Sequence, residues 1–205
     1  MWYILSISKN LTQTISLVDL ATRERLLGQR GFVLWLTGLS GAGKSTIAYA
    51  LEHRLVENGH AAFVLDGDNV RHGLSADLGF SPEHRAENIR RVGHVASLFA
   101  DAGLIAICAF ISPERQARQS CRKIAGTDRF AEIHLDVPVE VCEARDPKGL
   151  YAQARAGTIT EFTGVSALYQ APENPDLAID THQLSIRQSV DAIVSLLIAH
   201  TVIEA

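Results

Sequence analysis

Short apolar runs alternate with helical repeats along most of the chain. Between the runs, apolar residues recur at steps of three and four, most clearly over 84–102 and 185–200. Five runs have the length of buried strands: 32–36, 61–65, 104–110, 132–137 and 177–179. Strands that alternate with helices pair in parallel through right-handed crossovers. The pattern therefore predicts an α/β fold, a three-layer sandwich around a parallel, five-stranded sheet.

Two segments fall outside this alternation. Residues 1–30 have weak periodicity and form a leader, in which leucines between 17 and 27 could make a short helix that packs on the main domain of 31–205. The second segment, about 146–174, is a long polar and glycine-rich excursion between the fourth and fifth strands. A segment of this kind can act as a lid that excludes water. The alternative is a solvated loop whose charges are incidental.

Composition narrows the classes of function. The 205 residues suit one domain, and the 47% of hydrophobic residues can build a core. The net charge of −4 offers no broad basic field for nucleic acid. The three cysteines form no CxxC pair, which argues against a disulfide framework or zinc site. The absence of an 18-residue apolar run and of a signal peptide predicts a cytoplasmic protein without membrane spans.

A glycine-rich segment that follows the first strand fits the pattern GxxxxGK[ST] and opens a helix. Its backbone N–H groups can surround phosphate oxygens, its lysine supplies a charge, and its serine hydroxyl can bind Mg²⁺. The segment predicts nucleoside triphosphate binding, although alone it does not separate a kinase from a GTPase or a motor ATPase. The predicted phosphate-binding residues are Gly38, Ser40, Gly41, Ala42, Gly43, Lys44, Ser45 and Thr46.

Asp66 and Asp68 follow the second strand, at the edge of the sheet where ligands of parallel sheets bind. Asp66 could accept a proton from an acceptor hydroxyl or help to hold Mg²⁺. The alternative is a simple turn in which Asp68 caps the next helix.

Arginines cluster in the segment 71–91. Arg71, Arg85 and, beside them, Asn88 could bind an anionic acceptor, since guanidinium groups bind phosphate and sulfate in bidentate fashion. For Arg90 and Arg91, a solvated helix face is an equal alternative. In the lid, Arg145 and Lys148 could neutralise the transferring phosphoryl group.

Two further positions are candidates for substrate contact. Phe80 lies in a loop, where an aromatic ring either fills the core or stacks on a base. Ser112 ends the third strand and could contact substrate or cap a helix that begins at Pro113.

Taken together, the motifs resemble those of the adenylylsulfate kinase family. The matching segments, from about 25 to 180, are LTGLSGAGKST, LDGDNVRHGL, LGFS, RAENIRRVGHVASLFADAG, FISP, DVPVEVCEARDPKGLYAQAR and EFTG. The resemblance implies a P-loop kinase that uses ATP and Mg²⁺ to phosphorylate the 3′-hydroxyl of adenosine 5′-phosphosulfate. Members of this family are commonly dimers, so a homodimer is the expected assembly.

The resemblance also implies roles for single residues. It places the catalytic aspartate at Asp66, beside Lys44, and acceptor contacts at Arg71, Arg85 and Asn88. Further substrate contacts are expected at Asp68, Ile111, Ser112 and Lys148, and Ser112, the serine of the FISP segment, is expected to be catalytic together with Asp66 and Lys44. Phe80 and Phe162 correspond to the aromatic pair that encloses adenine, and Ser45 and Asp66 to the metal site. Ser166 and Leu168 stand where many relatives have an acidic residue and a proline.

Three other functions are alternatives to this one. A kinase of another small acceptor, such as a nucleoside or an antibiotic, would not use adenosine phosphosulfate. A GTPase should carry a guanine-selecting NKxD motif late in the chain, and none occurs. A regulatory domain that only binds nucleotide would be expected to have lost Lys44, Ser45 or Asp66, which are all present.

Overall fold

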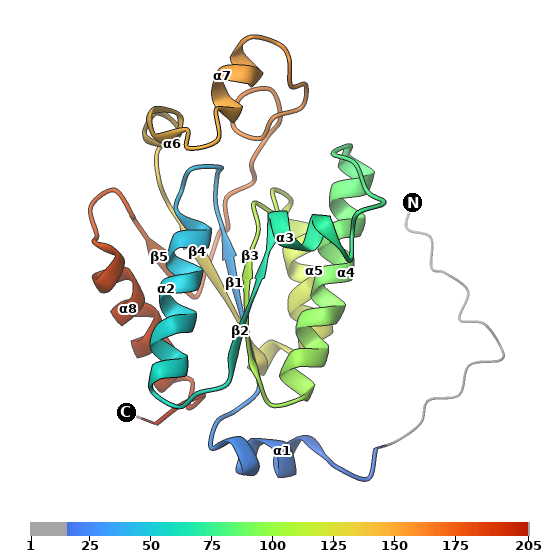
Figure 1. Ribbon diagram of the computed structural model, residues 1–205, viewed down its shortest axis with the longest axis vertical. Coiled ribbons are helices and arrows are strands. Elements are labelled where there is room, and N and C mark those ends of the chain that lie inside the picture. The colour runs from blue at the N-terminus through green and yellow to red at the C-terminus, as the bar shows by residue number, and fades with distance from the viewer. Residues whose placement is uncertain (1–15, 205) are drawn as a thin grey trace, which may run out of the picture.

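The computed structural model describes residues 16–204, and a parallel sheet of five strands lies at its centre (Figure 1). The order of the strands is β2-β3-β1-β4-β5. Each predicted run overlaps one strand, with ends that differ by at most two residues. The strands are β1 (Phe32–Thr37), β2 (Ala62–Asp66), β3 (Ile105–Ala109), β4 (Phe130–Leu135) and β5 (Leu177–Ile179).

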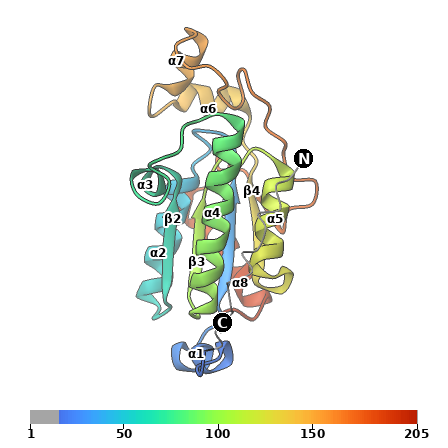
Figure 2. The same cartoon turned by 90° about the vertical axis from the view of Figure 1, so that its right-hand side faces the viewer.

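Helices cover both faces of the sheet, which confirms the predicted sandwich. On one face lie α2 (Lys44–Glu57) and α8 (Ile186–Ala199), and on the other lie α4 (Pro82–Asp101) and α5 (Arg115–Ala125) (Figures 1 and 2). All six residues of β1 are buried, because the central strand of a parallel sheet is covered on both sides. Alternate residues of β1 therefore enter two separate hydrophobic clusters.

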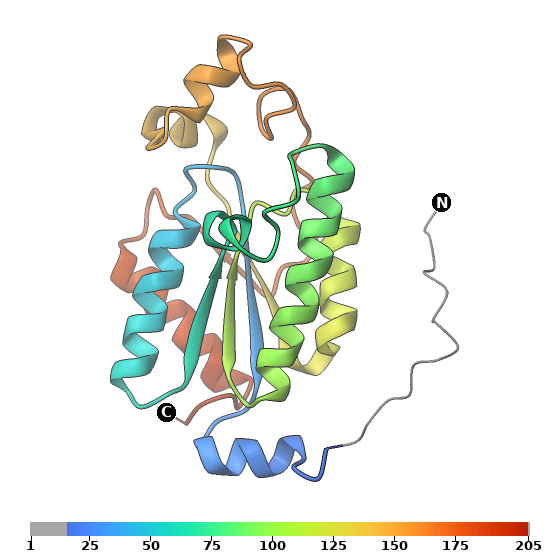
Figure 3. The same ribbon diagram turned by 45° about the vertical axis from the view of Figure 1, so that its right-hand side comes forward.

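The shorter helices lie at the two ends of the sheet. At the carboxyl ends of the strands are α3 (Gly67–His72), α6 (Val139–Arg145) and α7 (Leu150–Arg155), while α1 (Leu20–Leu27) lies at the opposite end (Figure 3). A 3₁₀ turn, Thr127–Arg129, precedes β4. Of residues 16–204, no helix combines the length and apolar character that a membrane span requires.

The predicted leader is only partly the packed helix that we expected. Residues 1–15 lie outside the described part of the chain. The helix α1 forms, yet none of its residues is buried, and Leu17 and Leu26 are exposed. Leu27 is the leucine that approaches the sheet domain, where it lies against Gly103. The prediction that these leucines pack together on the main domain was therefore wrong for Leu17 and Leu26.

Gln29 joins the amino ends of three strands. Its amide nitrogen donates to the carbonyl groups of Ala61 and Gly103, both at 2.9 Å, and its amide oxygen accepts from the Ala61 N–H at 2.8 Å. A buried amide with three bonds of this kind fixes the spacing of the segments that it joins. Glu24 of α1 adds a bond to the Gly31 N–H.

β2 is an edge strand, and the carboxylate of Glu52 accepts a hydrogen bond from the Val64 N–H at 2.7 Å.

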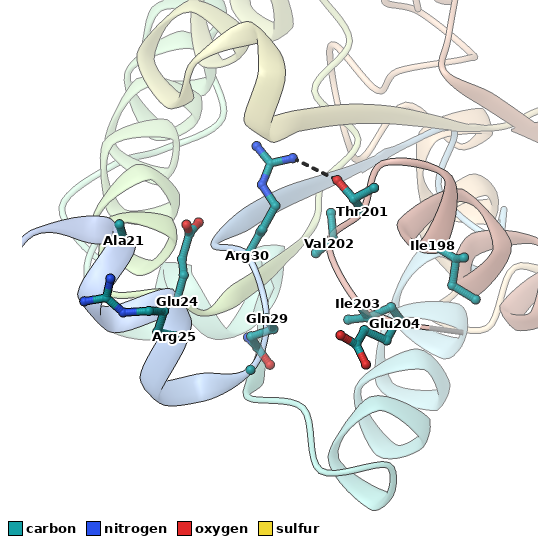
Figure 4. A pocket seen from close by; sticks show the side chains of 11 residues that line it. Ala21, Glu24, Arg25, Gln29, Arg30, Ile198, Thr201, Val202, Ile203 and Glu204 are labelled. Carbon is teal, nitrogen blue, oxygen red and sulfur yellow. Dashed lines mark hydrogen bonds between the residues drawn. The ribbon is translucent and has the colours of Figure 1, made fainter.

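A cavity of about 730 Å³ lies between α1 and the segment after α8, with Arg25, Arg30 and Glu204 among its lining residues (Figure 4). This cavity is at the opposite end of the sheet from the glycine-rich loop.

Candidate active site

The glycine-rich loop connects β1 to α2 and has a backbone that other residues adopt with difficulty. Gly38, Gly41 and Gly43 have φ values of 152°, 77° and 93°. A Cβ on Gly38 would lie 2.8 Å from the Leu135 carbonyl oxygen, and one on Gly41 would lie 2.7 Å from that of Cys142. The glycines are thus needed both for the turn and for close packing on neighbouring backbone. The loop delivers the amino end of α2 to the carboxyl edge of the sheet.

The other predicted loop residues lie in the same turn. Ser40 accepts a hydrogen bond from the Tyr151 hydroxyl through its carbonyl group, and Ala42 accepts one from Thr181. Ser45 and Thr46 lie exposed in the first turn of α2.

Lys44 folds back over the loop. Its Nζ donates to the carbonyl oxygens of Gly38 at 3.0 Å and Leu39 at 2.8 Å. Burial lowers the pKa of Lys44 to about 8. The ammonium group therefore lies at the centre of the loop.

Ser45 and Asp66 meet across the cleft between α2 and β2. The Ser45 hydroxyl donates to Asp66 Oδ2 at 2.6 Å, and Asp66 Oδ1 accepts from the Asp68 N–H at 3.0 Å. Asp66 is therefore the N-cap of α3, and the prediction that Asp68 forms this cap was wrong. The cap falls on Asp66 because α3 begins directly after β2. A hydroxyl and a carboxylate in contact form an oxygen donor set that fits Mg²⁺.

Arg71 and Phe80 are in contact with each other. Arg71 donates to the carbonyl groups of Leu78 and Gly79, and its guanidinium group lies 4.4 Å from the centre of the Phe80 ring. Phe80 is 67% exposed, so its ring does not fill the core. The arginine supports an aromatic face that is open to solvent.

Arg85 bridges α4 and the lid. It donates to the Phe80 carbonyl oxygen at 2.7 Å, to the Glu161 carbonyl oxygen at 2.7 Å and to the Thr163 hydroxyl at 2.8 Å. Burial lowers the pKa of Arg85 from its ordinary value. The bonds connect the backbone at Phe80 to the residues on either side of Phe162.

Asn88 lies one turn further along α4 and is buried. Within residues 16–204, its Oδ1 atom has no hydrogen-bond partner. A buried amide oxygen without a partner is costly, so it is suited to a donor from a ligand. Arg90 and Arg91 differ from the other arginines of this segment, since they bind acidic side chains, including Glu87 and Asp77.

Ser112 is buried in the turn after β3. Its Oγ accepts a hydrogen bond from Trp35 Nε1 at 3.0 Å and donates to Thr37 Oγ1 at 3.1 Å. The N-cap of α5 is Glu114, so the prediction that Ser112 caps this helix was wrong. The helix begins too late for the Ser112 side chain to reach its first N–H groups. The Ile111 carbonyl oxygen accepts from Thr37, and Ser112 lines a small cavity together with Arg85.

Aromatic and charged residues of the lid make its contacts with the glycine-rich loop and with the turn after β2. Phe162 is buried and packs edge-on against Tyr151 with ring centres 5.0 Å apart. Its N–H donates to the Ser166 hydroxyl, whereas Leu168 is exposed. Lys148 forms an ion pair with Asp68. The lid therefore contacts both the phosphate loop and the turn after β2.

Arg145 connects the start of the lid to the loop after β5. It donates to the carbonyl oxygens of Gly41 at 3.2 Å and Thr181 at 2.9 Å, and to Thr181 Oγ1 at 3.0 Å. Sequence reasoning missed Thr181. Its position just after the fifth strand, where parallel sheets bind ligands, was the signal that could have found it.

A phosphate loop, a lysine and a serine–aspartate pair lie at one edge of a parallel sheet, beneath a lid. This arrangement defines the chain as a P-loop kinase. Comparison with known proteins gives the family: the model described as adenylylsulphate kinase matches residues 30–180. The chain belongs to the adenylylsulphate kinase family, and its enzyme class is phosphotransferase.

Similar proteins agree with this assignment. The adenylyl-sulfate kinase of Enterobacter sp. (strain 638) is 59% identical over 167 residues, which cover 82% of this chain and 83% of the relative. The APS kinase of Mycobacterium tuberculosis, solved with AMPPNP and APS, is 50% identical with a TM-score of 0.79, covering 82% of this chain and 98% of that one. A hexameric APS kinase from Thiobacillus denitrificans is 39% identical with a TM-score of 0.66, covering 90% of this chain and 32% of that one.

Proposed function

We propose that the chain transfers the γ-phosphoryl group of ATP to the ribose 3′-hydroxyl of adenosine 5′-phosphosulfate. The product would be 3′-phosphoadenosine 5′-phosphosulfate, as in sulfate activation. The observation that carries the proposal is the contact between Ser45 and Asp66, which sets a carboxylate beside the phosphate loop. Arg71 on α3 and Arg85 and Asn88 on α4 would bind the acceptor.

The donor side would bind the triphosphate. The N–H groups of the loop 38–46 would surround the phosphate oxygens, and Lys44 would turn from its carbonyl partners to the outer phosphates. Arg145 lies between the loop and Thr181, where it can contact the nucleotide. Its positive charge, with that of Lys148, would neutralise charge that develops on the transferring group.

Ser45 and Asp66 would hold Mg²⁺ with the phosphate oxygens of ATP. The ion would supply positive charge to the phosphates when it is bound. Both side chains offer oxygen atoms, which Mg²⁺ prefers.

The acceptor side would bind the adenosine phosphosulfate. Asp66 would accept the proton of the 3′-hydroxyl as its oxygen bonds to the γ-phosphorus and the bond from that phosphorus to the bridging oxygen breaks, with ADP as the leaving group. Arg71 and Arg85 would bind the phosphosulfate group, and the free oxygen of Asn88 would accept a hydrogen bond. The rings of Phe80 and Phe162 would enclose adenine, a contact worth about 1–3 kcal/mol per stacked base.

The remaining substrate contacts lie around these groups. Asp68 and Lys148, which pair with each other, would separate to receive the acceptor. Ile111 and Ser112 would form the floor of the site, in the turn that is packed against Thr37.

An acceptor panel tests the proposal. The purified chain is given Mg-ATP with adenosine 5′-phosphosulfate, AMP or simple nucleosides, and phosphoryl transfer is measured. We expect strong preference for the phosphosulfate. The control is Asp66→Asn, which retains an oxygen for the α3 cap and should lower kcat about 10²- to 10⁴-fold. Equal use of AMP, or full activity of the variant, would contradict the assignment.

Some expectations from the sequence remain predictions. They are the homodimer, the cytoplasmic location, and the division into a leader, 1–30, and a kinase domain, 31–205, with a lid at about 146–174.

A further inference from the structure

Arg118 is a buried charge that the proposed reaction does not use. It lies on α5, and its side chain is 1% exposed. Its Nε donates to the carboxylate of Glu132 in β4. A buried ion pair of this kind is weak evidence for stability, because both charges lose their water. Its retention in the interior therefore calls for a role that a pair of apolar residues could not fill.

The guanidinium group of Arg118 connects three segments that are far apart in the chain. Besides Glu132, its Nη1 donates to the Ser112 carbonyl oxygen at 2.6 Å, and its Nη2 donates to the Gln170 carbonyl oxygen at 2.7 Å. The Ser112 carbonyl group belongs to the turn after β3, in which Ile111 and Ser112 would contact the substrate, and we call this segment the substrate turn. The Gln170 carbonyl group belongs to the end of the lid. A guanidinium group carries its donors on three nitrogen atoms held in one rigid plane, a spread that the single nitrogen of an ammonium group cannot reproduce.

The turn at Ser112 needs such support. Ser112 has a φ of +39°, a conformation that residues other than glycine rarely adopt. A strained residue keeps this conformation only where its surroundings hold it firmly. Here the side chain is bound by Trp35 and Thr37, and the carbonyl group is bound by Arg118.

The end of the lid is fixed at the same place. The Gln170 N–H donates to the Pro113 carbonyl oxygen at 2.9 Å, and the Tyr169 hydroxyl lies 3.0 Å from Thr37 Oγ1. The Arg118 guanidinium carbon lies 5.9 Å from the centre of the Tyr169 ring. Lid and substrate turn thus share one buried anchor.

We propose that Arg118 is a positioning residue that holds the Ser112 turn and the end of the lid in register for acceptor binding. It acts through the backbone of Ser112 and Gln170 and touches neither substrate. The proposal rests on the proposed function for its kinetic assay, since adenosine phosphosulfate is the probe.

Arg118→Lys tests the proposal against Arg122→Lys. Arg122 lies one turn further on the same helix and binds the Phe130 carbonyl oxygen and Asp176 instead. We expect Arg118→Lys to raise the KM for adenosine phosphosulfate about tenfold while the KM for ATP changes less than about twofold. Arg122→Lys should leave both values near those of the wild type. Equal changes in both KM values for Arg118→Lys would overturn the proposal.

A second variant separates positioning from folding. Arg118→Met combined with Glu132→Leu removes both charges of the pair, so neither is left buried alone, but it also leaves the Ser112 and Gln170 carbonyl groups without this donor; we expect it to fold with a lowered melting temperature. It cannot donate to the Ser112 carbonyl group, so kcat/KM for the acceptor should fall about 10²-fold. A normally folded double variant with wild-type acceptor kinetics would show that Arg118 is not needed for positioning.

A fluorescence measurement that needs no substrate can test the role of Arg118 independently of the proposed function. The chain has two tryptophans, so Trp35 is the single one left in a Trp2→Phe background. Loss of the Arg118 bond should loosen Ser112 and shift the emission of Trp35 to longer wavelength. An unchanged spectrum in the double variant would count against the anchor. If the wild type fails to use adenosine phosphosulfate while the shift occurs, the proposed function fails and the anchor stands.

Discussion

The ammonium group of Lys44 lies inside the loop to which it belongs. Its Nζ is bound by two carbonyl groups of its own loop, and burial lowers its pKa to about 8. The carbonyl groups partly compensate the charge, but they cannot replace the water that the ammonium group has lost. A bound triphosphate would favour the charged form again.

The pKa of Lys44 predicts how donor binding depends on pH. Because the neutral amine cannot attract phosphate, kcat/KM for ATP should decline as pH rises above about 8. Initial rates at low ATP between pH 6 and 10 give this profile. Lys44→Arg, whose guanidinium group stays charged, should lose the alkaline decline even if it is slower. A wild-type profile that stays flat to pH 9.5 would contradict the prediction.

The lowered pKa of Lys44 should also make the free energy of unfolding depend on pH, but this contribution should rise with pH whereas kcat/KM for ATP falls. The folded-state pKa lies below the ordinary value of 10.5, so the unfolded chain binds more protons between these values. The contribution of Lys44 to the free energy of unfolding therefore rises as pH increases from about 8 to 10.5.

Single residues could be predicted from the sequence where local spacing decides their position. The loop glycines, Lys44 and Asp66 follow directly from a strand and a turn. Arg118 could not be found in this way, because its three partners are 6, 14 and 52 residues away. The helix caps at Asp68 and Ser112 were wrongly predicted, since a shift of one or two residues in a helix start moves the cap to another side chain.

The part of the lid between Lys148 and Thr163 is joined to the phosphate loop, to α4 and to the turn after β2 by hydrogen bonds and one ion pair. Tyr151 binds the Ser40 carbonyl oxygen, Arg85 binds Glu161 and Thr163, and Lys148 binds Asp68. Contacts of this kind can be exchanged for ligand contacts without disturbing the core.

Lys148→Ala tests the part played by the lid in transfer. We expect kcat to fall by about 10- to 100-fold, because a positive charge near the transferring group is lost. The melting temperature should change little, since the ion pair with Asp68 is largely exposed. Arg155→Ala is the matched control, because it breaks another exposed lid pair, with Glu143. Equal losses of activity in the two variants would contradict a specific role for Lys148.

At the level of elements, the strands were predictable and the lid helix was not. Buried parallel strands are continuous apolar runs, so each was found within two residues. β4 ends at Leu135, although the apolar run continues to the buried Val137, and the predicted end was too late. The helix α7 was missed because its six residues begin after Gly149 in polar sequence, where the Asp146 carboxylate accepts from two N–H groups of its first turn.

Across the whole molecule, the hydrogen bonds of Gln29 and the candidate active site lie at opposite ends of the sheet. Gln29 joins the segments that precede the strands, and the phosphate loop follows the carboxyl end of β1. Changes at the first end should therefore alter folding without altering the reaction.

Gln29→Ala should lower the free energy of unfolding by about 1–3 kcal/mol, because it leaves buried backbone groups of Ala61 and Gly103 without partners. The kcat should stay within about twofold of the wild type, since the substitution leaves the geometry of the active site unchanged. Urea unfolding and initial rates check both values. Arg25→Ala serves as control, because Arg25 binds Thr22 within its own helix. An unchanged unfolding midpoint for Gln29→Ala would refute this account.

The sandwich and its parallel pairing could be predicted for the whole molecule, but the order β2-β3-β1-β4-β5 could not be derived from the apolar pattern. Each of the five apolar runs could form either a central strand or an edge strand of the sheet. The order depends on packing between distant segments, such as the contact of α2 with α8 and of α4 with α5.

That order leaves β2 at the rim, where an N–H group of a parallel sheet can recruit a foreign strand. The carboxylate of Glu52 already occupies the Val64 N–H. An incoming chain would have to expel a charged group before it could pair there, and the opposite rim, β5, is only three residues long. Both rims of the sheet thus offer little to a foreign strand, which disfavours edge-to-edge aggregation of the folded chain.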